Sequence, residues 1–403
     1  MLPIPIRIPH AGTVFANRLI KQPVDQTRAP RMRHRILLSA TEDWPNATHY
    51  ADGFSAAGCE VAAFAPRSAP AHASGFVAKS LFYRPLAPVQ SLRAAIEAAR
   101  PDLIVSCDER ALITLLKLYD LGKERPTSYA SLIERSLGVP ENYHGILSRS
   151  AGLAAMTEAG VRVPLTLPVD GEDKLDVCIR EVGLPAVLKA DETCGGQGVA
   201  IVRTLPEAHR AYRALVSPTR VRNVARFVRN RNMHFLLDAV APATRRISVQ
   251  RFVEGRVAAS AFAADKGKIV AGFSYDVLDA QKGGLGPPTT IRRIDCPEMD
   301  AATCAVAARF GLTGAHGLDF IRDSAGAAHL IEINPRATRG GTLPFGFGRD
   351  IPHGLASMLG AHPSGIRSPL QSDLVDFSAS SSPARSSSTT GWAIPRLSAP
   401  GAG

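Results

Sequence analysis

The sequence has no long hydrophobic run, no cysteine pairs at metal-binding spacing and few aromatic residues. No stretch of about 18 apolar residues occurs, so we expect no membrane-spanning helix. The six cysteines include no C-x-x-C pair, which argues against a zinc ribbon and against a disulfide framework. Prolines at positions 3, 5 and 9 interrupt the clean apolar stretch that a signal peptide needs. These absences favour a protein of the reducing cytoplasm.

The composition is that of an ordinary globular protein with a basic excess. Hydrophobic residues make up 45% and charged residues 21% of the 403 residues, which argues against wholesale disorder and against a collagen-like chain. At about 150 residues per domain, this length predicts two to three domains. The 47 Lys and Arg exceed the 36 Asp and Glu by 11. A net charge of this size favours an anionic partner, but charge alone does not choose among nucleic acid, nucleotide and membrane surface.

Three segments stand apart from the globular pattern. Residues 1–33 are predicted to be a flexible basic leader, and a true start at Met32 is one hypothesis for it. Residues 363–403 are rich in Ser and Pro, which predicts a disordered tail. Between 218 and 256 nine arginines gather: Arg220, Arg222, Arg226, Arg229, Arg231, Arg245, Arg246, Arg251 and Arg256. A solvated face and a surface for a membrane or polyanion are the two interpretations, and sparse aromatics argue against specific nucleic-acid binding.

The folded part alternates short β-type runs with helical runs, which is typical of an α/β protein. We expect strands over 36–40, 61–65 and 103–107, with helices over 91–99 and 109–121. From residue 247 onward the runs are β-rich. Turns at Glu254-Gly255 and Asp265-Lys266-Gly267 predict hairpins there, and therefore an antiparallel sheet.

A lysine and a glycine-rich loop form the first chemical motif. Lys189 ends an expected strand over 186–189, and Gly195, Gly196 and Gly198 follow before a second strand over 199–203. Glycines let backbone N–H groups approach phosphates, and the ammonium supplies positive charge. The loop has no Gly-Lys-Ser/Thr and is therefore not a Walker A loop. A plain hairpin is the alternative interpretation of this loop.

The second motif lies in the expected hairpin over 317–336, around a turn at 323–326. Glu332 and Asn334 alternate on one strand and so share a face, and Asp319 lies on the other strand. Carboxylate and amide oxygens are hard ligands of the kind that Mg²⁺ takes when it also holds phosphates. A pair of solvated acids is the alternative, but the apolar flanks disfavour it, since unpaired carboxylates cost free energy there.

Together the two motifs resemble the ATP-grasp superfamily of ligases, of the carboxylate–amine or carboxylate–thiol type with a carbamoyl-phosphate-synthase-like domain, over about 35–362. The resemblance implies an α/β fold class, with α+β character in the C-terminal module. It implies a Rossmann-like pre-ATP-grasp domain over 34–147 and an ATP-grasp domain over 148–362. Within the second domain it implies a lid over 148–247 and an antiparallel-sheet subdomain over 248–362.

The resemblance also implies roles for individual residues. Lys189, Gly195, Gly196 and Gly198 correspond to the family's phosphate-binding residues, and Arg149 stands where the family has a further lysine. The side chain of Gln250 and the backbone of Arg251 and Val253 correspond to the adenine-binding hinge. The family's ribose-binding acid is replaced by Val257, and Glu254 is offered as its substitute. The implied metal ligands are Asp319, Glu332 and Asn334, and the implied catalytic residues are Arg336 and Lys189.

The activity implied by the resemblance is an ATP-dependent ligation that uses Mg²⁺ or Mn²⁺. A small-molecule carboxylate would become an acyl-phosphate, which an amine or similar nucleophile then attacks, and a homodimer is compatible with this expectation. The alternative is a catalytically weak ATP-grasp scaffold that binds an anionic polymer or membrane through its arginine-rich segment.

Overall fold

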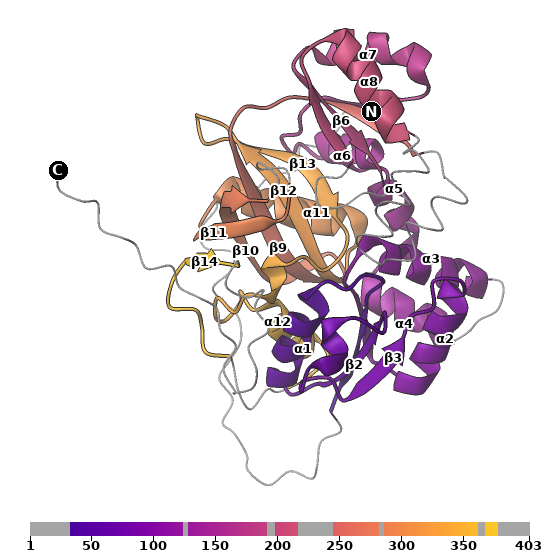
Figure 1. The fold of residues 1–403 in the computed structure, drawn as a ribbon. Helices are drawn as coiled ribbons and strands as arrows, with labels where there is room; N and C mark the ends of the chain where they lie inside the picture. The colour runs from indigo at the N-terminus through magenta and orange to yellow at the C-terminus, as the bar shows by residue number, and fades with distance from the viewer. Residues whose placement is uncertain are drawn as a thin grey trace, which may run out of the picture.

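The computed structural model describes residues 33–123, 128–191, 198–216, 245–281, 286–361 and 367–377. Outside these ranges lie residues 1–32 of the expected leader, Gly195, Gly196 and most of the arginine-rich segment. The described chain folds into three sheets with helices around them (Figure 1). No helix in the described ranges is long and apolar enough to span a membrane.

The N-terminal domain is a parallel sheet covered by helices on both faces. Its strand order is β3-β2-β1-β4, and all pairings are parallel. Helix α1 covers one face, and α2, α3 and α4 cover the other. The elements are β1 (Arg35–Ser39), α1 (Asn46–Ala56), β2 (Glu60–Ala65), η1 (Pro70–Ala73), β3 (Lys79–Phe82), α2 (Pro88–Ala99), β4 (Leu103–Ser106), α3 (Glu109–Lys123) and α4 (Ser128–Leu137).

A small antiparallel sheet follows, after three short helical elements. Its order is β5-β8-β6-β7, and α7 and α8 pack against it. Figure 1 shows this sheet and its two helices at the top of the molecule, far from the N-terminal domain. The elements are η2 (Pro140–Asn142), α5 (Tyr143–Leu147), α6 (Arg149–Glu158), β5 (Thr166–Val169), η3 (Glu172–Lys174), α7 (Leu175–Val182), β6 (Ala186–Ala190), β7 (Val199–Val202), α8 (Leu205–Val216) and β8 (Ile247–Arg251).

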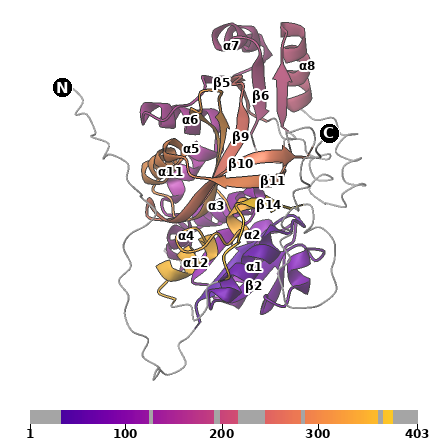
Figure 2. The same ribbon diagram turned by 90° about the vertical axis from the view of Figure 1, so that its left-hand side faces the viewer.

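A six-stranded antiparallel sheet lies between the other two, as Figure 2 shows. Its order is β13-β12-β9-β10-β11-β14. Positive φ angles of 47° at Lys266 and 81° at Gly267 form the two-residue turn that closes the β9–β10 hairpin. The elements are β9 (Arg256–Asp265), β10 (Lys268–Ala280), β11 (Pro288–Ile294), α11 (Pro297–Phe310), β12 (Gly314–Arg322), β13 (Ala328–Asn334), η4 (Gly340–Thr342), α12 (Ile351–Met358) and β14 (Leu374–Asp376).

The hydrophobic cores do not follow the expected domain boundary at 147. Along β1, Leu37 enters one core while Ile36 and Leu38 enter another, because successive side chains of a strand point to opposite faces. Both cores also take residues from β9, with Phe262 in the first and Ala261 in the second. The N-terminal sheet and the six-stranded sheet therefore share their interior. The small sheet has a core of its own, built from residues between 169 and 249.

The structure differs from the sequence-based expectations in three places. Strand β8 pairs with β5 and β6, so the small sheet extends to Arg251, beyond the expected lid boundary at 247. The turn at Glu254-Gly255 closes no hairpin, since β8 and β9 lie in different sheets. Residues 367–377, expected within the disordered tail, form β14 on the edge of β11, and Phe377 beyond it is buried.

Candidate functional site

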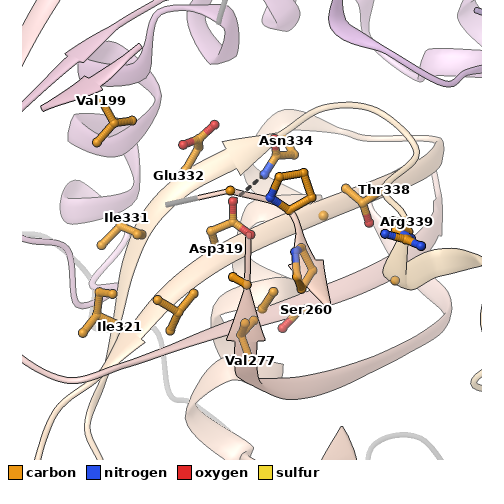
Figure 3. Close-up of a pocket in the computed structure, with 18 of the residues that line it drawn as sticks. Val199, Ser260, Val277, Asp319, Ile321, Ile331, Glu332, Asn334, Thr338 and Arg339 are labelled. Carbon is orange, nitrogen blue, oxygen red and sulfur yellow. Dashed lines mark hydrogen bonds between the residues drawn. The ribbon is translucent and has the colours of Figure 1, made fainter. Parts of the chain in front are cut away.

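One pocket of about 480 Å³ joins the small sheet, the six-stranded sheet and the start of α1. It is lined by most of the described residues that the sequence predicted for a nucleotide and metal site. These are Arg149, Lys189, Gln250, Arg251, Val253, Asp319, Glu332, Asn334 and Arg336. Figure 3 shows how the lining side chains converge from several strands. The two chemical motifs, more than 120 residues apart in sequence, thus meet at one place.

Lys189 comes from β6 and is almost completely buried, with 4% of its surface exposed. Its Nζ donates a hydrogen bond to the carbonyl oxygen of Ile331 on β13, 2.9 Å away, and so crosses from one sheet to the other. Burial and, to a smaller extent, the nearby Arg149 lower the pKa of Lys189 to about 8. The carboxylates of Glu332 and Asp319 act in the opposite direction. The ammonium is therefore mostly charged at neutral pH but holds its proton less tightly than a surface lysine does.

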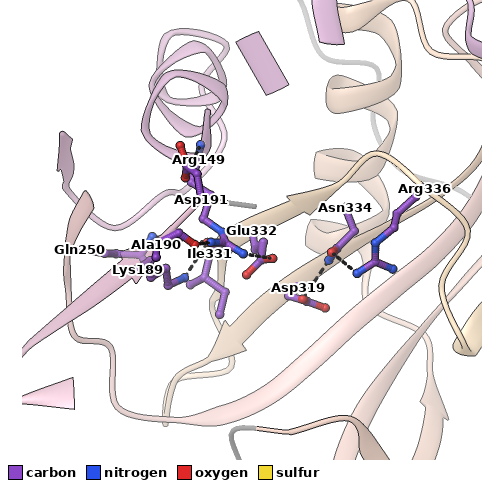
Figure 4. A network of polar contacts seen from close by, with 10 residues as sticks. All are labelled: Arg149, Lys189, Ala190, Asp191, Gln250, Asp319, Ile331, Glu332, Asn334 and Arg336. Atoms are coloured by element: carbon purple, nitrogen blue, oxygen red, sulfur yellow. Dashed lines mark hydrogen bonds and ion pairs between the residues drawn. The ribbon is translucent and has the colours of Figure 1, made fainter. Parts of the chain in front are cut away.

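Arg149 begins α6 and makes a second bridge between the sheets. Its Nη2 donates to Oε1 of Glu332 at 3.1 Å, and only 9% of the Arg149 side chain is exposed. Its Nη1 donates to the carbonyl oxygen of Ala190, and its backbone N–H lies 3.3 Å from Oδ1 of Asp191. Figure 4 shows these contacts fixing the guanidinium beside Lys189 and Glu332. The arginine therefore supplies positive charge at the position expected for the family's lysine.

The candidate metal ligands lie side by side on the β12–β13 hairpin. Asp319 and Glu332 are direct register partners, and Nδ2 of Asn334 donates to Oδ2 of Asp319 at 3.0 Å. Burial and the nearby Glu332 raise the pKa of Asp319. Burial alone would also raise the pKa of Glu332, but Arg149 and Lys189 outweigh it and lower that pKa. Like charges directly opposite one another destabilise a strand pair, so a cation bound between the two carboxylates would offset this repulsion.

This donor set fits a magnesium ion that also binds substrate oxygens. Among the described residues no group of three or more His, Cys, Asp or Glu is placed to hold a metal. Asp319, Glu332 and Asn334 would therefore supply only part of the oxygen shell that Mg²⁺ prefers. Mg²⁺ in proteins characteristically takes one or two carboxylates and completes its shell with water and phosphate oxygens.

Arg336 follows the metal ligands on the segment after β13. Its Nη2 donates to Oδ1 of Asn334 at 3.2 Å, and its Nη1 donates to the carbonyl oxygen of Ala337 at 3.4 Å. An amide oxygen has two lone pairs, so Asn334 can accept from Arg336 and still offer a second lone pair to a cation. Arg336 is thus held next to the candidate metal site (Figure 4).

The residues expected at the adenine hinge divide into two groups. Gln250 is buried, and its Nε2 donates to Oγ1 of Thr166 at 2.9 Å. Arg251 and Val253 also line the pocket. Glu254 is exposed and does not line the pocket, whereas Val257 does, so the expected substitute for the ribose acid is not brought to this site. Gly198 is buried next to β7 but does not line the pocket either.

The pocket extends beyond Arg336 to residues that the sequence did not single out. This far wall consists of Trp44 and Asn46 at the start of α1, Tyr275 on β10, and Thr338, Arg339 and Gly340 after β13. No spacing pattern marks these positions, because they come from three separate parts of the chain. Figure 3 shows Thr338 and Arg339 on the opposite side of Asp319 from Ile331 and Val199.

Comparisons with known proteins were made by sequence and by fold. No protein-family model matches the chain. The carbamoyl phosphate synthase large chain of Methanoculleus marisnigri is 24% identical over 192 residues, which are 47% of this chain. The matched segment spans only 16% of the length of that relative.

Similar solved structures extend the likeness to most of the chain. The biotin carboxylase domain of Hydrogenobacter thermophilus 2-oxoglutarate carboxylase, solved with MgADP, ADP and bicarbonate, has a TM-score of 0.59 at 14% identity. It covers 86% of this chain and 74% of its own. N5-carboxyaminoimidazole ribonucleotide synthetase from Thermus thermophilus has a TM-score of 0.58 at 17% identity, covering 82% of this chain and 80% of its own. The chain therefore has the fold of the ATP-grasp superfamily, as its sequence motifs predicted.

Proposed function

We propose that this protein is an ATP- and Mg²⁺-dependent ligase that activates a small-molecule carboxylate as an acyl-phosphate for attack by an amine or similar nucleophile. The observation that carries the proposal is the meeting of three cationic side chains, Lys189, Arg149 and Arg336, with the Asp319–Glu332 pair in one pocket. Cations suit phosphates, and a carboxylate pair suits the metal that accompanies them. The solved relative that contains MgADP supports the same choice of ligand.

The end of the pocket near Lys189 suits a nucleotide. Apolar side chains from the small sheet, Val187, Val199 and Ile201, face Ile321 and Ile331 of the six-stranded sheet. A slot between apolar walls suits the faces of a purine ring, and Gln250 with the backbone after it suits the ring's polar edge. Lys189 and Arg149 would then bind the phosphates, since both lie where the two sheets meet.

Asp319, Glu332 and Asn334 would hold the metal. Bound there, Mg²⁺ or Mn²⁺ would offset the negative charge of the nucleotide's phosphates. Arg336 lies beside this set through its hydrogen bond to Asn334. Its planar guanidinium suits an oxygen-rich group that gains negative charge during phosphoryl transfer.

The reaction divides into two displacements. A carboxylate oxygen of the substrate attacks the γ-phosphorus, the bond to the bridging oxygen breaks, and ADP leaves. The amine then attacks the carbonyl carbon of the acyl-phosphate, inorganic phosphate leaves with the bonding electrons, and the amine loses a proton. Lys189, Arg149 and Arg336 contribute charge and position, and no protein nucleophile is needed.

The test is nucleotide binding measured by calorimetry with and without Mg²⁺. We expect ADP binding that depends on Mg²⁺ and that Lys189→Ala weakens by about 10- to 100-fold, since charge-assisted contacts of this kind are worth about 1.5–3 kcal/mol. Lys268→Ala, at an exposed position on β10 outside the pocket, is the matched control and should bind as the wild type does. Wild-type protein that binds no Mg-nucleotide, or Lys189→Ala that binds it equally well, would overturn the proposal.

A further inference from the structure

A histidine beside the small sheet lies between two carboxylates. Nδ1 of His209 on α8 is 2.8 Å from Oε1 of Glu172 on η3, and its Nε2 is 2.8 Å from Oδ1 of Asp176 on α7. An ionised carboxylate only accepts hydrogen bonds, so both ring nitrogens donate, and an imidazole that donates from both nitrogens is positively charged. These three residues, the His209 cluster, therefore join α8 to both η3 and α7 through one protonated ring.

Glu172 and Asp176 are the charged groups that act on the ring, and the hydrogen bonds to them raise the pKa of His209. Arg213 of α8 also donates to Oε1 of Glu172, at 2.8 Å. The remaining charged side chains of η3, α7 and α8 pair elsewhere or are exposed: Asp173 pairs with Lys174 at 3.3 Å, Glu207 accepts from the backbone N–H of Arg203 at 2.7 Å, and Arg180, Glu181 and Arg210 are exposed. Of the strands against which α8 packs, β7 brings no charge, and β6 and β8 bring Lys189 and Arg251, which line the pocket.

Loss of the ring proton breaks one of the two contacts of His209. A neutral imidazole has a single N–H, and its second nitrogen presents a lone pair. At either end of the ring that lone pair would face a carboxylate oxygen, which has no proton to donate. Because η3 and α7 are consecutive, over Glu172–Lys174 and Leu175–Val182, deprotonation releases α8 from one of its two contacts to a single segment. The junction of α8 with this segment is therefore weaker when His209 is neutral.

The helices joined by the His209 cluster support one wall of the pocket. Leu188 of β6 lies in the small-sheet core with residues of α7 and α8, whereas its neighbours Val187 and Lys189 line the pocket, because side chains alternate along a strand. The carbonyl oxygen of Val182, at the end of α7, accepts a hydrogen bond from Nε of Arg251, 3.1 Å away, and Arg251 also lines the pocket. Opening of α7 or α8 therefore removes support from the nucleotide side of the small sheet.

We propose that the His209 cluster is a pH-sensitive clamp that holds α8 to the η3–α7 segment while His209 is protonated and loosens when His209 is neutral. Because the folded chain raises the pKa of His209, this contribution to stability is complete below about pH 6.5, the ordinary pKa of histidine. It is lost as the pH rises through the higher pKa of the folded chain. The clamp acts on the local opening of the small sheet, which has a core of its own.

Two measurements on the full chain test the clamp. The NMR signal of the His209 Cε1 proton should titrate with a pKa above 6.5. Hydrogen exchange read by mass spectrometry at pH 6 and pH 9, corrected for the chemical exchange rate at each pH, should show α7 and α8 opening about two- to fivefold more at pH 9, the size expected of one part-exposed ion pair. Helix α11, which packs in a different core, should show no such change.

Variants connect the pH dependence to the ring. His209→Gln carries no charge at either pH, so its corrected exchange in α7 and α8 should be equal at pH 6 and pH 9. The His209 side chain is 31% exposed, so the fold should tolerate this change. Asp176→Asn is the second variant and should lower the pKa of His209 measured by NMR. His144→Gln is the matched control, because His144 on α5 is exposed and its Nε2 lies 3.8 Å from Oδ2 of Asp120, and it should keep the wild-type pH dependence.

A pH dependence that is present in the wild type and in His144→Gln but absent from His209→Gln supports the clamp. An NMR pKa of His209 at or below 6.5 overturns it, and so does an Asp176→Asn variant that leaves this pKa unchanged. Equal corrected exchange of the wild-type helices at pH 6 and pH 9, or a pH dependence that His209→Gln retains, overturns it as well. None of these measurements uses a nucleotide, so failure of the clamp leaves the proposed function standing, and failure of Mg-ADP binding leaves the clamp standing.

Discussion

At the scale of single residues, the ion pair between Arg149 and Glu332 connects two sheets at the centre of the pocket. Nη2 of Arg149 lies 3.1 Å from Oε1 of Glu332, and the side chains of Arg149 and Glu332 are 9% and 20% exposed. Breaking a pair this buried by removing one partner leaves a charge without compensation, which costs more than the pair itself contributes. Glu332 therefore has two tasks under the proposed function, since it pairs with Arg149 and would bind the metal.

Glu332→Gln separates these two tasks. The amide still accepts a hydrogen bond from Arg149 but no longer brings a negative charge to the metal. We expect the rate of ADP release to fall on the order of 10²–10³, and the apparent affinity for Mg²⁺ to fall with it. Steady-state assays across a Mg²⁺ titration measure both. Turnover at the wild-type level would contradict the assignment of Glu332 as a metal ligand.

The free energy of unfolding depends on pH through His316. The ring is buried against Phe262, and burial lowers the pKa of His316 to about 4. Its Nε2 lies 3.0 Å from the carbonyl oxygen of Thr313 and donates to it. The unfolded chain takes up a proton at this ring below about pH 6.5, whereas the folded chain does not. Stability from His316 is thus complete above that pH and is lost as the pH falls toward 4.

The difference between wild type and His316→Gln isolates this contribution. We expect the wild type to lose about 3 kcal/mol more unfolding free energy than the variant between pH 7 and pH 4. Urea unfolding at half-unit pH steps measures the two curves. Parallel curves would show that His316 titrates alike in the folded and unfolded states.

At the scale of elements, α12 depends on a segment that the sequence assigned to a tail. Asp350 caps α12 by accepting from the backbone N–H of His353 at 3.1 Å. The same carboxylate accepts two hydrogen bonds from Arg367, at 3.1 and 3.0 Å. Asp350 and Arg367 are both buried, with 4% and 9% of their side chains exposed. The helix start and the segment around 367 are therefore held by one carboxylate.

Asp350→Ala should cost about 3–5 kcal/mol, because it leaves the guanidinium of Arg367 buried with a weaker partner and removes the cap. Asp350→Asn should cost less, since its amide oxygen can still cap the helix. Chemical denaturation of both variants gives the two values. An Asp350→Ala variant within about 1 kcal/mol of wild type would show that the pair behaves as a surface ion pair does.

The sequence predicted the elements that carry strong local patterns. Strands near 36–40, 61–65 and 103–107 and the hairpin around 323–326 are present, because alternation and turn residues determine them locally. The turn at Glu254-Gly255 was misassigned, since a turn signal does not say which sheet the next strand joins. Strand β14 was missed because its stability comes from pairing with β11, far away in the sequence. The pocket's far wall was missed for the same reason.

At the scale of the whole molecule, two cores are shared and one is separate. The N-terminal sheet and the six-stranded sheet contribute residues to the same two hydrophobic cores, whereas the small sheet has a separate hydrophobic core. Groups of residues that share a core open cooperatively, and groups with separate cores can open independently. The described structure therefore consists of two cooperative units, although it contains three sheets.

Two core truncations test this division. Leu188→Ala, in the small-sheet core, should raise the rate of amide hydrogen exchange in β5, β6, β7 and β8 alone. Leu38→Ala, in a shared core, should raise it in both the N-terminal and the six-stranded sheet. Each change should cost about 2–5 kcal/mol, and hydrogen exchange read by mass spectrometry locates the effect. Faster exchange confined to the N-terminal sheet in Leu38→Ala would mean that this sheet is a separate unit.

The connection between β1 and α1 brings Trp44 and Asn46 to the pocket, more than 100 residues before Arg149, the first residue proposed to bind phosphate. One part of the pocket wall and the residues proposed to bind ATP are therefore encoded in different stretches of the gene. Substitutions in this connection change the shape of the pocket without altering Lys189 or the β12–β13 hairpin. The connection is consequently a place where related proteins of this fold can differ in pocket shape while keeping the same residues on β6 and on the β12–β13 hairpin.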